Sequence, residues 1–462
     1  MAKTKTPEIE YHETVSDRTV TDFLNSEYKD FAQYVITTRA CPSLIDGFKT
    51  GARKIIHAAF TATLKDKKKH KMLELVGDTY TKTMYAHGNA SLEGTIMTLG
   101  ASFLDNFNPI DIIGQGGTLR EPNSYASPRY LFVSQSKYLE LIYGVDYDIL
   151  EYVFDEGMYL EPVSYLPIIP TVLTSRSEGL APGYRFKSYS YNPIDIIDMC
   201  INRVNGEDKH GLLRPYIRGI DPKKFFYDNE ENCWSNKGTW VTNGDMLFIT
   251  DLPFDVHTSK YEKLLDKLVE TGFIKDWRNF GKDGSIDYRV IFEKGILNKI
   301  SDKQLISKFK LVSKLTGEQL QVVDEKGKIR HFETPELLLE YFVKYRLNKY
   351  NDRKTKLITI KEQQLKENTA LCKFIDLVTS NKLKINNRPI GDIKLDMDKY
   401  ELSHELLKIQ VSKLTKEEKE EIMKRNKELE EELLYIKNTS IETMYINDLK
   451  NLRKEIEKEF KQ

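Results

Sequence analysis

The last third of the chain constrains the fold most, because its helical periodicity runs far beyond the ~11–12 residues of an average helix. From Thr334 onward, apolar residues recur at helical spacing with dense charge between them: Leu337, Leu338, Tyr341, Phe342, Tyr345, Tyr350, Leu357, Ile360 and Leu365. This spacing predicts one very long helix, interrupted at residues 386–389. A second long charged helix is expected over residues 415–436 and a third over 442–461.

Two arrangements of these helices agree with the pattern. Two long helices separated by a small insert form an antiparallel coiled-coil arm with a globular tip. The same residues also suit an ordinary helical bundle, and periodicity alone does not separate the two.

The N-terminal region has a different pattern. Residues 1–25 are polar and lack helical spacing, so we expect an irregular arm. Helices are predicted over residues 30–39 and 50–65, separated by Cys41-Pro42 and a turn at Asp46-Gly47. A helix, a turn and a basic helix are typical of a helix-turn-helix, although helical hairpins are also common in enzymes.

The middle of the chain is mixed. Prolines punctuate residues 145–300, and short apolar runs such as Val172-Leu173 and residues 246–249 are predicted to be strands. Residues 254–271 have helical spacing. We therefore expect an α/β segment here.

Length and composition exclude several classes of protein. The 462 residues predict two to four domains. The chain is 40% hydrophobic and 11% aromatic, which is too apolar for a disordered chain. No run approaches the ~18 apolar residues of a membrane helix, and no signal peptide is evident. The four cysteines form no C-x-x-C pair, which excludes a zinc ribbon and favours a reducing cytoplasm, that of a host if the chain is viral.

Charge is sorted along the chain, although 70 Lys+Arg balance 70 Asp+Glu. Residues 29–71 carry ten basic and three acidic residues, a net charge of +7, whereas residues 413–432 carry eight acids against six bases. Sorted charge can bind an anion even when the total is zero. We therefore do not exclude nucleic acid as a partner. Lys67-Lys68-Lys69 by themselves are interpreted as a solvated loop.

Arg129-Tyr130 is the pair with the most specific chemistry. A phenol is a weak nucleophile until its anion is stabilised or its proton removed. A neighbouring guanidinium can stabilise that anion and the charge of a phosphorane-like transition state. The pair is therefore suited to attack on a phosphodiester, although most of the 26 tyrosines are expected to be packing residues.

Two nearby segments suit the same chemistry. His87-Gly88-Asn89 places a titratable imidazole beside a flexible glycine, as a phosphate-approach loop or an ordinary turn would. Gly114-Gln115-Gly116-Gly117 allows close backbone approach but lacks the spacing of a P-loop or a dinucleotide fingerprint. Arg39, Lys49, Arg53 and Lys54 lie on or beside the predicted helix-turn-helix, and we expect Arg53 and Lys54 to point from the polar edge of its second helix, where phosphate contacts are made.

These segments together resemble the breakage-reunion region of type IIA DNA topoisomerases. Residues 39–54 match R-x-x-P-x-x-x-D-G-x-K-x-x-x-R-K at every fixed position. Tyr85-Ala86-His87-Gly88 is similar to the Y-H-H-G motif, with Ala86 in place of the first His, and Ser127-Pro128-Arg129-Tyr130 resembles the active-site motif. Residues 167–173 and 178–184 resemble the family's P-x-x-P-x-x-L and E-G-I-G-T-G-W run, with Leu180 in place of Ile and further departures at Ala181, Pro182 and Tyr184. The resemblance covers nearly the whole chain.

The resemblance implies a role for each matching residue. Tyr130 would form a 5′-phosphotyrosyl bond to one DNA strand, Arg129 would stabilise the scissile phosphate, and His87 would position it. Arg39, Lys49 and Arg53 would hold the DNA backbone. Leu180 would be an apolar wedge between bases, with a buried strand-end leucine as the alternative. Arg185 and Lys187 could grip the bent DNA beyond the wedge, although simple solvation is the other interpretation.

The resemblance also implies an assembly. The fold would be a multidomain α+β chain: an arm at 1–28, a winged-helix DNA gate at 29–160, a tower at 161–330, and a coiled-coil arm with a C-gate at 331–462. Two copies would form the gate and a second dimer contact. No ATPase or TOPRIM region is apparent; Asp146-Tyr-Asp148 and Asp396-Met-Asp398 are interpreted as surface carboxylates. Mg²⁺ and ATP are therefore expected on a large partner subunit, as for the medium subunit of T-even phage topoisomerases, which this chain is similar to.

Two other classes remain in view from the residues alone. A non-enzymatic DNA-bridging protein would keep the basic segment and the long helices but would not require Arg129-Tyr130 or His87. A metal-dependent nuclease would need a carboxylate cluster with suitable context, which the sequence does not offer.

Overall fold

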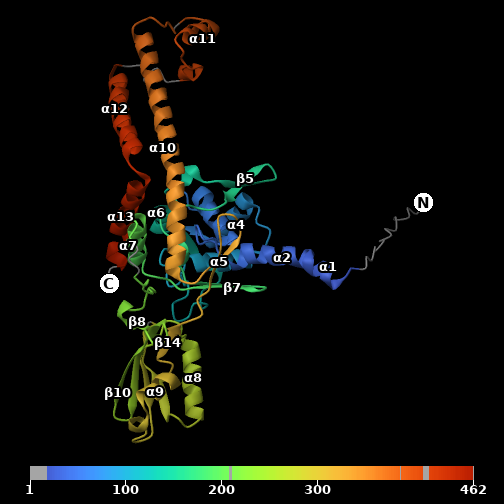
Figure 1. The fold of residues 1–462 in the computed structure, drawn as a ribbon, viewed down its shortest axis with the longest axis vertical. Coiled ribbons are helices and arrows are strands. Elements are labelled where there is room, and N and C mark those ends of the chain that lie inside the picture. The colour runs from blue at the N-terminus through green and yellow to red at the C-terminus, as the bar shows by residue number, and fades with distance from the viewer. Residues whose placement is uncertain (1–17, 208–210, 283, 386, 409–415, 461–462) are drawn as a thin grey trace, which may run out of the picture.

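A computed structural model of the chain describes residues 18–207, 211–282, 284–385, 387–408 and 416–460. Most of the predicted N-terminal arm, residues 1–17, lies outside these ranges, as do residues 386 and 415 at two predicted helix boundaries. The described chain forms a central body, a lobe at one end and a long helical arm at the other (Figure 1).

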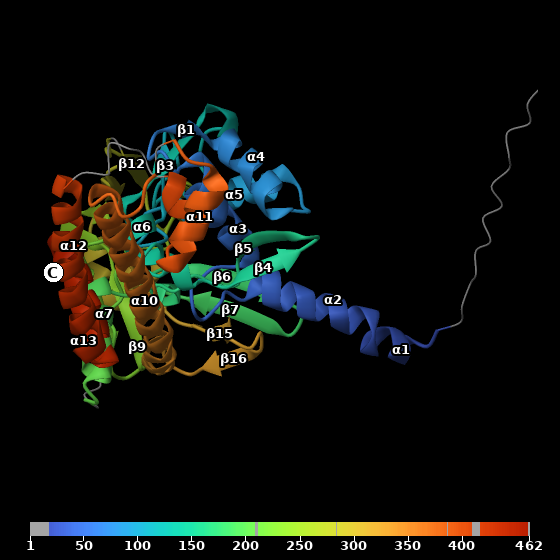
Figure 2. The same ribbon diagram turned by 90° about the horizontal axis from the view of Figure 1, so that it is seen from above.

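The first helices project from the body (Figures 1 and 2). The predicted irregular arm is wrong for its last residues, because a helix begins at Val20, where the Thr19 side chain accepts a hydrogen bond from the Asp22 N–H at 3.1 Å. The helices predicted over 30–39 and 50–65 are confirmed, although each ends in a π-helical turn. The elements are α1 (Val20–Asn25), α2 (Glu27–Val35), η1 (Ile36–Ala40), α3 (Thr50–Ala58) and η2 (Ala59–Thr63).

A small antiparallel sheet of order β1-β3-β2 packs beside the next two helices. Its central strand buries Val133, which pairs with His70 on one side and Ile112 on the other. Alternation along this strand turns Leu131 and Val133 toward the core and Phe132 outward. The elements are β1 (His70–Lys71), α4 (Met72–Thr83), α5 (Asn89–Leu99), β2 (Ile110–Ile113), η3 (Pro128–Tyr130) and β3 (Phe132–Gln135).

Three hairpins and several short helices complete the body. Val172-Leu173 were predicted as a strand, but they lie in the 3-10 turn η5, where the Leu173 N–H donates to the Pro170 carbonyl at 3.0 Å. Prolines before this segment cannot donate to a sheet, which favours the turn. The elements are α6 (Lys137–Tyr143), η4 (Tyr147–Ile149), β4 (Tyr152–Asp155), β5 (Met158–Pro162), η5 (Thr171–Leu173), β6 (Ser177–Ala181), β7 (Tyr184–Ser188), α7 (Pro193–Val204), β15 (Leu320–Val323) and β16 (Ile329–Phe332).

The lobe has a hydrophobic core of its own, centred on residues such as Leu247, Leu265 and Phe309. The predicted strand over 246–249 and helix over 254–271 are confirmed as β11 and α8. Residues 165–220, by contrast, share the core of the body, so the core does not divide at 161. The elements are η6 (Pro222–Lys224), β8 (Phe225–Asp228), β9 (Cys233–Lys237), β10 (Thr239–Asn243), β11 (Met246–Asp251), α8 (Thr258–Glu270), β12 (Asp276–Asn279), β13 (Tyr288–Ile291), η7 (Leu297–Lys299), α9 (Asp302–Lys308) and β14 (Val312–Leu315).

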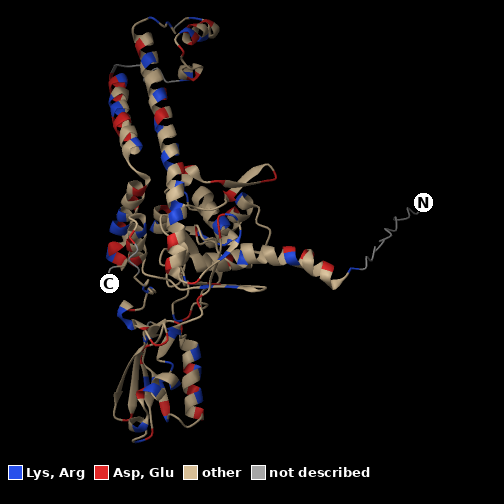
Figure 3. Cartoon of the chain, in the orientation of Figure 1, with Lys and Arg blue, Asp and Glu red and all other residues tan. Residues whose placement is uncertain are grey.

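The arm confirms the long helices predicted from periodicity. The first has 45 residues, and its early turns lie in the core of the body, whereas its far half runs beside α12 (Figure 1). Lys and Arg are interspersed with Asp and Glu along both helices (Figure 3). The last helix returns to the body and packs against α7. The elements are α10 (Pro335–Thr379), α11 (Ile390–Lys399), η8 (His404–Lys408), α12 (Lys416–Asn438) and α13 (Ile441–Phe460).

Candidate nucleic-acid cleavage site

Tyr130 ends the short turn η3, and one residue, Leu131, separates it from the central strand β3. Pro128 begins this turn, and the Tyr130 N–H donates to the Ser127 carbonyl at 2.9 Å. The side chain is 71% exposed, whereas the next residue, Leu131, is buried in the core. The strand therefore holds the backbone of Tyr130 firmly while its phenol remains open to an incoming group.

Arg129 is exposed beside Tyr130, and its Nε donates to Ser127 Oγ at 3.2 Å. No ion pair of Arg129 is found in the described structure. A guanidinium that no carboxylate neutralises keeps its charge available for a phosphate. The predicted pair Arg129-Tyr130 is thus presented together on the surface.

The glycine-rich turn supports this surface from beneath. A Cβ on Gly114, whose φ is +123°, would lie 2.8 Å from Leu131 Cδ2. The Ala126 N–H donates to the Gln115 carbonyl at 2.9 Å, which ties the turn to the loop before Tyr130. The glycine at position 114 therefore allows close packing against Leu131, the residue after the tyrosine.

His87 lies at the centre of a second polar cluster. Its Nε2 is 3.1 Å from Tyr34 Oη and 3.2 Å from an Arg39 guanidinium nitrogen. Because a guanidinium only donates, Nε2 accepts, and this arrangement assigns the proton of the neutral ring to Nδ1. Tyr34 belongs to the projecting helix α2. The Arg39 guanidinium lies over the Tyr34 ring, 5.4 Å from its centroid, in a cation–π contact. Sequence reasoning missed Tyr34, because only the fold brings α2 to the loop after α4.

The two polar clusters lie at opposite ends of α4. The Met72 N–H at its start donates to the Leu131 carbonyl at 3.1 Å, next to Tyr130. Near its other end, Tyr80 donates to the carbonyl of His87. The 12 residues of α4 span about 18 Å at 1.5 Å per residue. Tyr130 thus lies beside the first turn of α4, whereas His87 is bonded to the second half of the same helix.

Arg53 and Lys54 are placed differently from the prediction. Instead of pointing outward, Arg53 donates to both oxygens of the buried Asp46 at 2.7 and 3.0 Å, and only 11% of its side chain is exposed. Lys54 pairs with Glu161 at 2.8 Å and is 15% exposed. A buried cation needs a bonded anionic partner, and both residues find theirs inside the body.

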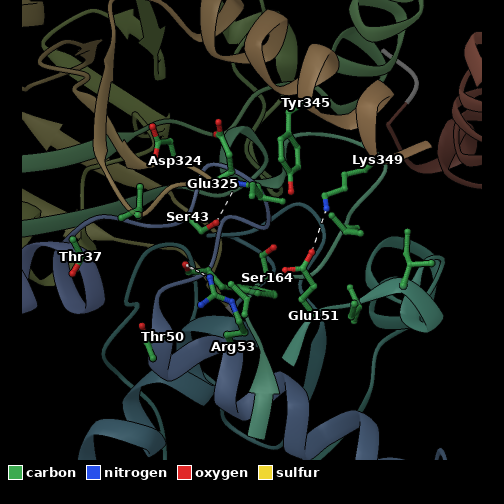
Figure 4. A pocket seen from close by; sticks show the side chains of 18 residues that line it. Thr37, Ser43, Thr50, Arg53, Glu151, Ser164, Asp324, Glu325, Tyr345 and Lys349 are labelled. Carbon is green, nitrogen blue, oxygen red and sulfur yellow. Dashed lines mark hydrogen bonds and ion pairs between the residues drawn. The ribbon is translucent and has the colours of Figure 1, made fainter. Parts of the chain in front are cut away.

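Arg53 lines a cavity of about 340 Å³ (Figure 4). Helix α10 contributes Tyr345 and Lys349 to the opposite wall, where Lys349 Nζ lies 3.5 Å from Glu151. Tyr130, Arg129 and His87 do not line this cavity. It therefore lies at the junction of the body with the arm, away from the exposed tyrosine.

Leu180 is 71% exposed on the hairpin of β6 and β7, so the alternative of a buried strand-end leucine is wrong. Its cross-strand partner Arg185 donates to Glu178 at 2.8 and 3.1 Å. Lys187 Nζ donates to the Thr316 carbonyl at 2.8 Å, and Lys49 Nζ donates to the Glu178 carbonyl at 3.1 Å. Burial lowers the pKa of Lys49. Lys49 and Lys187 thus tie the hairpin to neighbouring segments, whereas Arg185 bonds within the hairpin beside the exposed leucine.

A metal ion would need a cluster of suitable ligands among the described residues. Within the described ranges, no group of three or more His, Cys, Asp or Glu side chains is suitably placed to hold one. Asp146 was predicted to be a surface carboxylate, but it is buried and pairs with Arg346 and Arg353, which neutralise it. Asp396 pairs with Arg388 and Lys399.

The sequence and fold both match one family. The family model for the A subunit of DNA gyrase/topoisomerase IV matches residues 39–452. The chain belongs to this family. The mitochondrial DNA topoisomerase 2 of Dictyostelium discoideum is 29% identical over 97% of this chain and 36% of that protein. The DNA topoisomerase 2 of Arabidopsis thaliana is 30% identical over 82% of this chain and 26% of that protein.

A solved structure of the family has the same fold. The DNA-binding, cleavage and re-ligation domain of Plasmodium falciparum topoisomerase II superposes with a TM-score of 0.87 at 27% identity, covering 94% of this chain and 64% of that one. This chain thus spans only about a third or less of the length of these two topoisomerase 2 relatives. Along the described part of this family member, no helix has the length and apolarity that crossing a bilayer requires.

Proposed function

We propose that this chain cleaves and rejoins DNA as part of a type IIA DNA topoisomerase. The observation that carries the proposal is the exposed Tyr130 phenol, which lies at the end of η3, just before β3, beside the exposed Arg129. Family membership supports the same chemistry. The open double-strand gate would let a second duplex pass.

The reaction exchanges one phosphodiester bond for another. The Tyr130 phenol loses its proton, and its oxygen attacks a DNA phosphorus to form a 5′-phosphotyrosyl bond. The P–O3′ bond breaks, and the departing 3′-oxygen takes up a proton to become the 3′-hydroxyl. Arg129 stabilises the charge on the phosphate oxygens. Because phenols have a pKa of ~10, well below that of an alcohol, the phenolate leaves readily when the 3′-oxygen attacks in reverse. Resealing therefore needs no external energy.

Each active site is composed of two copies of the chain. The arrangement along α4 supports this, because Tyr130 lies beside the first turn of the helix, whereas His87, Tyr34 and Arg39 gather near its other end. The neutral His87 ring and the Arg39 guanidinium would receive the phosphate that the second copy's Tyr130 attacks. Lys49, Leu180, Arg185 and Lys187 would contact the DNA on either side, with Leu180 wedged between bases.

The finer assignment follows the resemblance of the motifs. Residues 29–160 form a winged-helix gate, the lobe is the tower, and α10 to α13 form a coiled-coil arm with a C-gate tip. A partner subunit like that of the T-even phage enzymes, in which this chain corresponds to the medium subunit, would bring Mg²⁺, ATP and the TOPRIM site. The cytoplasm, or a host's cytoplasm, would be its compartment.

The Tyr130→Phe variant tests the reaction in the assembled enzyme. Wild-type protein should yield covalent protein–DNA complexes on denaturation, and Tyr130→Phe should yield none. If Tyr130→Phe still forms covalent complexes with DNA, Tyr130 is not the nucleophile. A wild-type protein that binds DNA but never links to it would favour the non-enzymatic bridging protein instead.

Mixed dimers test the composite site. A dimer of one Tyr130→Phe copy and one His87→Ala copy has one doubly altered site and one intact site if the residues act across copies. We expect such dimers to nick one strand at close to the wild-type rate per site. If each copy used its own residues, both sites would be impaired and nicking would stay at the level of the single variants.

A further inference from the structure

Lys54 lies under the loop that carries His87. Its Nζ donates to the carbonyl of Thr83, the last residue of α4, at 2.6 Å. The final carbonyls of a helix have no partner within the helix and carry partial negative charge, so a cation there is well placed. The chain then leaves α4 through Met84, whose backbone is left-handed with φ +49°. Lys54 thus holds the point at which the loop begins.

Glu161 completes the contact from the other side. Its Oε2 lies 2.8 Å from Lys54 Nζ, and its side chain is 5% exposed. Glu161 comes from β5, Lys54 from α3 and Thr83 from α4, so one ammonium joins three elements. The carboxylate needs the ammonium, because an unpaired charge in this interior would be strongly unfavourable.

Aromatic contacts hold the loop that follows α4, residues 84–88, close to the helix. Tyr80 donates to the His87 carbonyl, and the Tyr85 ring meets the His87 ring edge-on, at 5.4 Å between centroids and 88°. Tyr80 and Tyr85 pack edge-on against each other at 5.5 Å. A shift of the last turn of α4 would therefore move the imidazole away from Tyr34 of α2 and Arg39 of η1.

We propose that Lys54 is a positioning residue, which through Glu161 and the Thr83 carbonyl holds His87 in place for the phosphate. It does not contact DNA. This inference rests on the proposed cleavage function, but it makes a separate statement about the protein without DNA. A phosphate-binding lysine would need a free ammonium, whereas this one is 15% exposed and has two anionic or carbonyl partners.

Salt dependence separates positioning from phosphate contact. The full chain with its partner subunit would be compared with Lys54→Met, Glu161→Gln, the double variant and Lys54→Arg. Each phosphate contact adds about 0.9 to the slope of log K against log salt. We expect unchanged DNA affinity and slope, and cleavage at least about 10-fold slower in both single variants. The double variant should be no slower than either single variant, and Lys54→Arg should recover part of the rate.

Lys82→Met is the matched control, because it removes a neighbouring exposed lysine from the same end of α4. Its cleavage rate should equal that of the wild type. A slope reduced by about one in Lys54→Met, together with normal cleavage by Glu161→Gln, would overturn the proposal and make Lys54 a phosphate contact.

Imidazole NMR tests the same inference without DNA. With ¹³C-labelled histidine in the full chain, which has eight histidines, the His87 signal can be assigned from its loss in His87→Asn. We expect Lys54→Met and Glu161→Gln to shift the His87 ring signal and Lys82→Met to leave it in place. An unmoved signal in both single variants would refute positioning, whether or not the protein cleaves DNA. Circular dichroism would confirm that each variant is folded, and Glu161→Gln suffices if Lys54→Met is not.

Discussion

Arg346 of α10 and Asp146 of the body form an ion pair that solvent does not reach, since their side chains are 0% and 2% exposed. Arg346 Nε also donates to the Pro167 carbonyl at 3.0 Å, and Arg353 lies 3.2 Å from the other oxygen of Asp146. The long helix is thus anchored to the body by buried charge as well as by apolar packing.

Asp146→Asn should therefore destabilise the chain strongly. Removing one partner of a buried pair costs about 3–5 kcal/mol, because the other charge remains in the interior. Urea unfolding would measure the loss. Lys344→Ala is the control, since its pair with Glu340 on the same helix is exposed and should change the free energy of unfolding by at most about 0.5 kcal/mol. Equal effects of the two variants would contradict the anchoring role.

Glu318 predicts a pH-dependent stability. Burial raises its pKa from 4.5 to about 7, although bonds from the Tyr189 N–H and the Tyr191 hydroxyl favour the carboxylate. Between these two values the folded state binds more protons than the unfolded state, so the free energy of unfolding falls as pH rises. The loss should be on the order of 2–3 kcal/mol across this window.

Glu318→Gln removes the titrating group and should flatten that part of the stability curve. Unfolding in urea at several values between pH 4.5 and pH 7.5 would compare the two proteins. Glu333→Gln, at an exposed position nearby, should keep the wild-type dependence. A Glu318→Gln curve parallel to the wild type would mean that another group carries the effect.

Gly179 allows the β6-β7 hairpin to pack closely against η1. A Cβ at this position would lie 2.0 Å from the backbone oxygen of Ala40, which cannot move without displacing η1. Gly179→Ala should destabilise the chain by about 1–3 kcal/mol, as overpacking does, and should reduce DNA cleavage. Gly94→Ala on α5 meets open space and should be neutral or stabilising by up to about 1 kcal/mol. Thermal unfolding and cleavage assays on both variants would test this, and equal stability of the two variants would contradict the close packing at Gly179.

Leu180→Ala should separate folding from DNA bending. Because the side chain is 71% exposed, the free energy of unfolding should change by less than about 0.5 kcal/mol. If the leucine wedges between bases, losing that contact should slow cleavage at least about 10-fold and reduce bending of a doubly labelled duplex, since unstacking a step involves a few kcal/mol. Tyr159→Ala, which is 75% exposed on the other hairpin, should affect neither. Normal bending by Leu180→Ala would exclude the wedge.

The sequence by itself determined the elements whose signals are local. The long helices were predictable because apolar spacing repeats within each of them, and α10, α12 and α13 begin within two residues of the expected positions. The helices around the Asp46-Gly47 turn followed from the same rule. The motifs around Tyr130 also sufficed for the family, because they depend on residue type and order.

Only the tertiary structure decided which charges face inward. Arg53, Lys54 and Asp146 have the composition of surface residues, but their partners Asp46, Glu161 and Arg346 come from other segments and take them into the interior. The distance between Tyr130 and His87 was equally beyond the sequence, because it is set by the helix that lies between them. Burial and separation are properties of long-range packing, and no spacing along one chain encodes them.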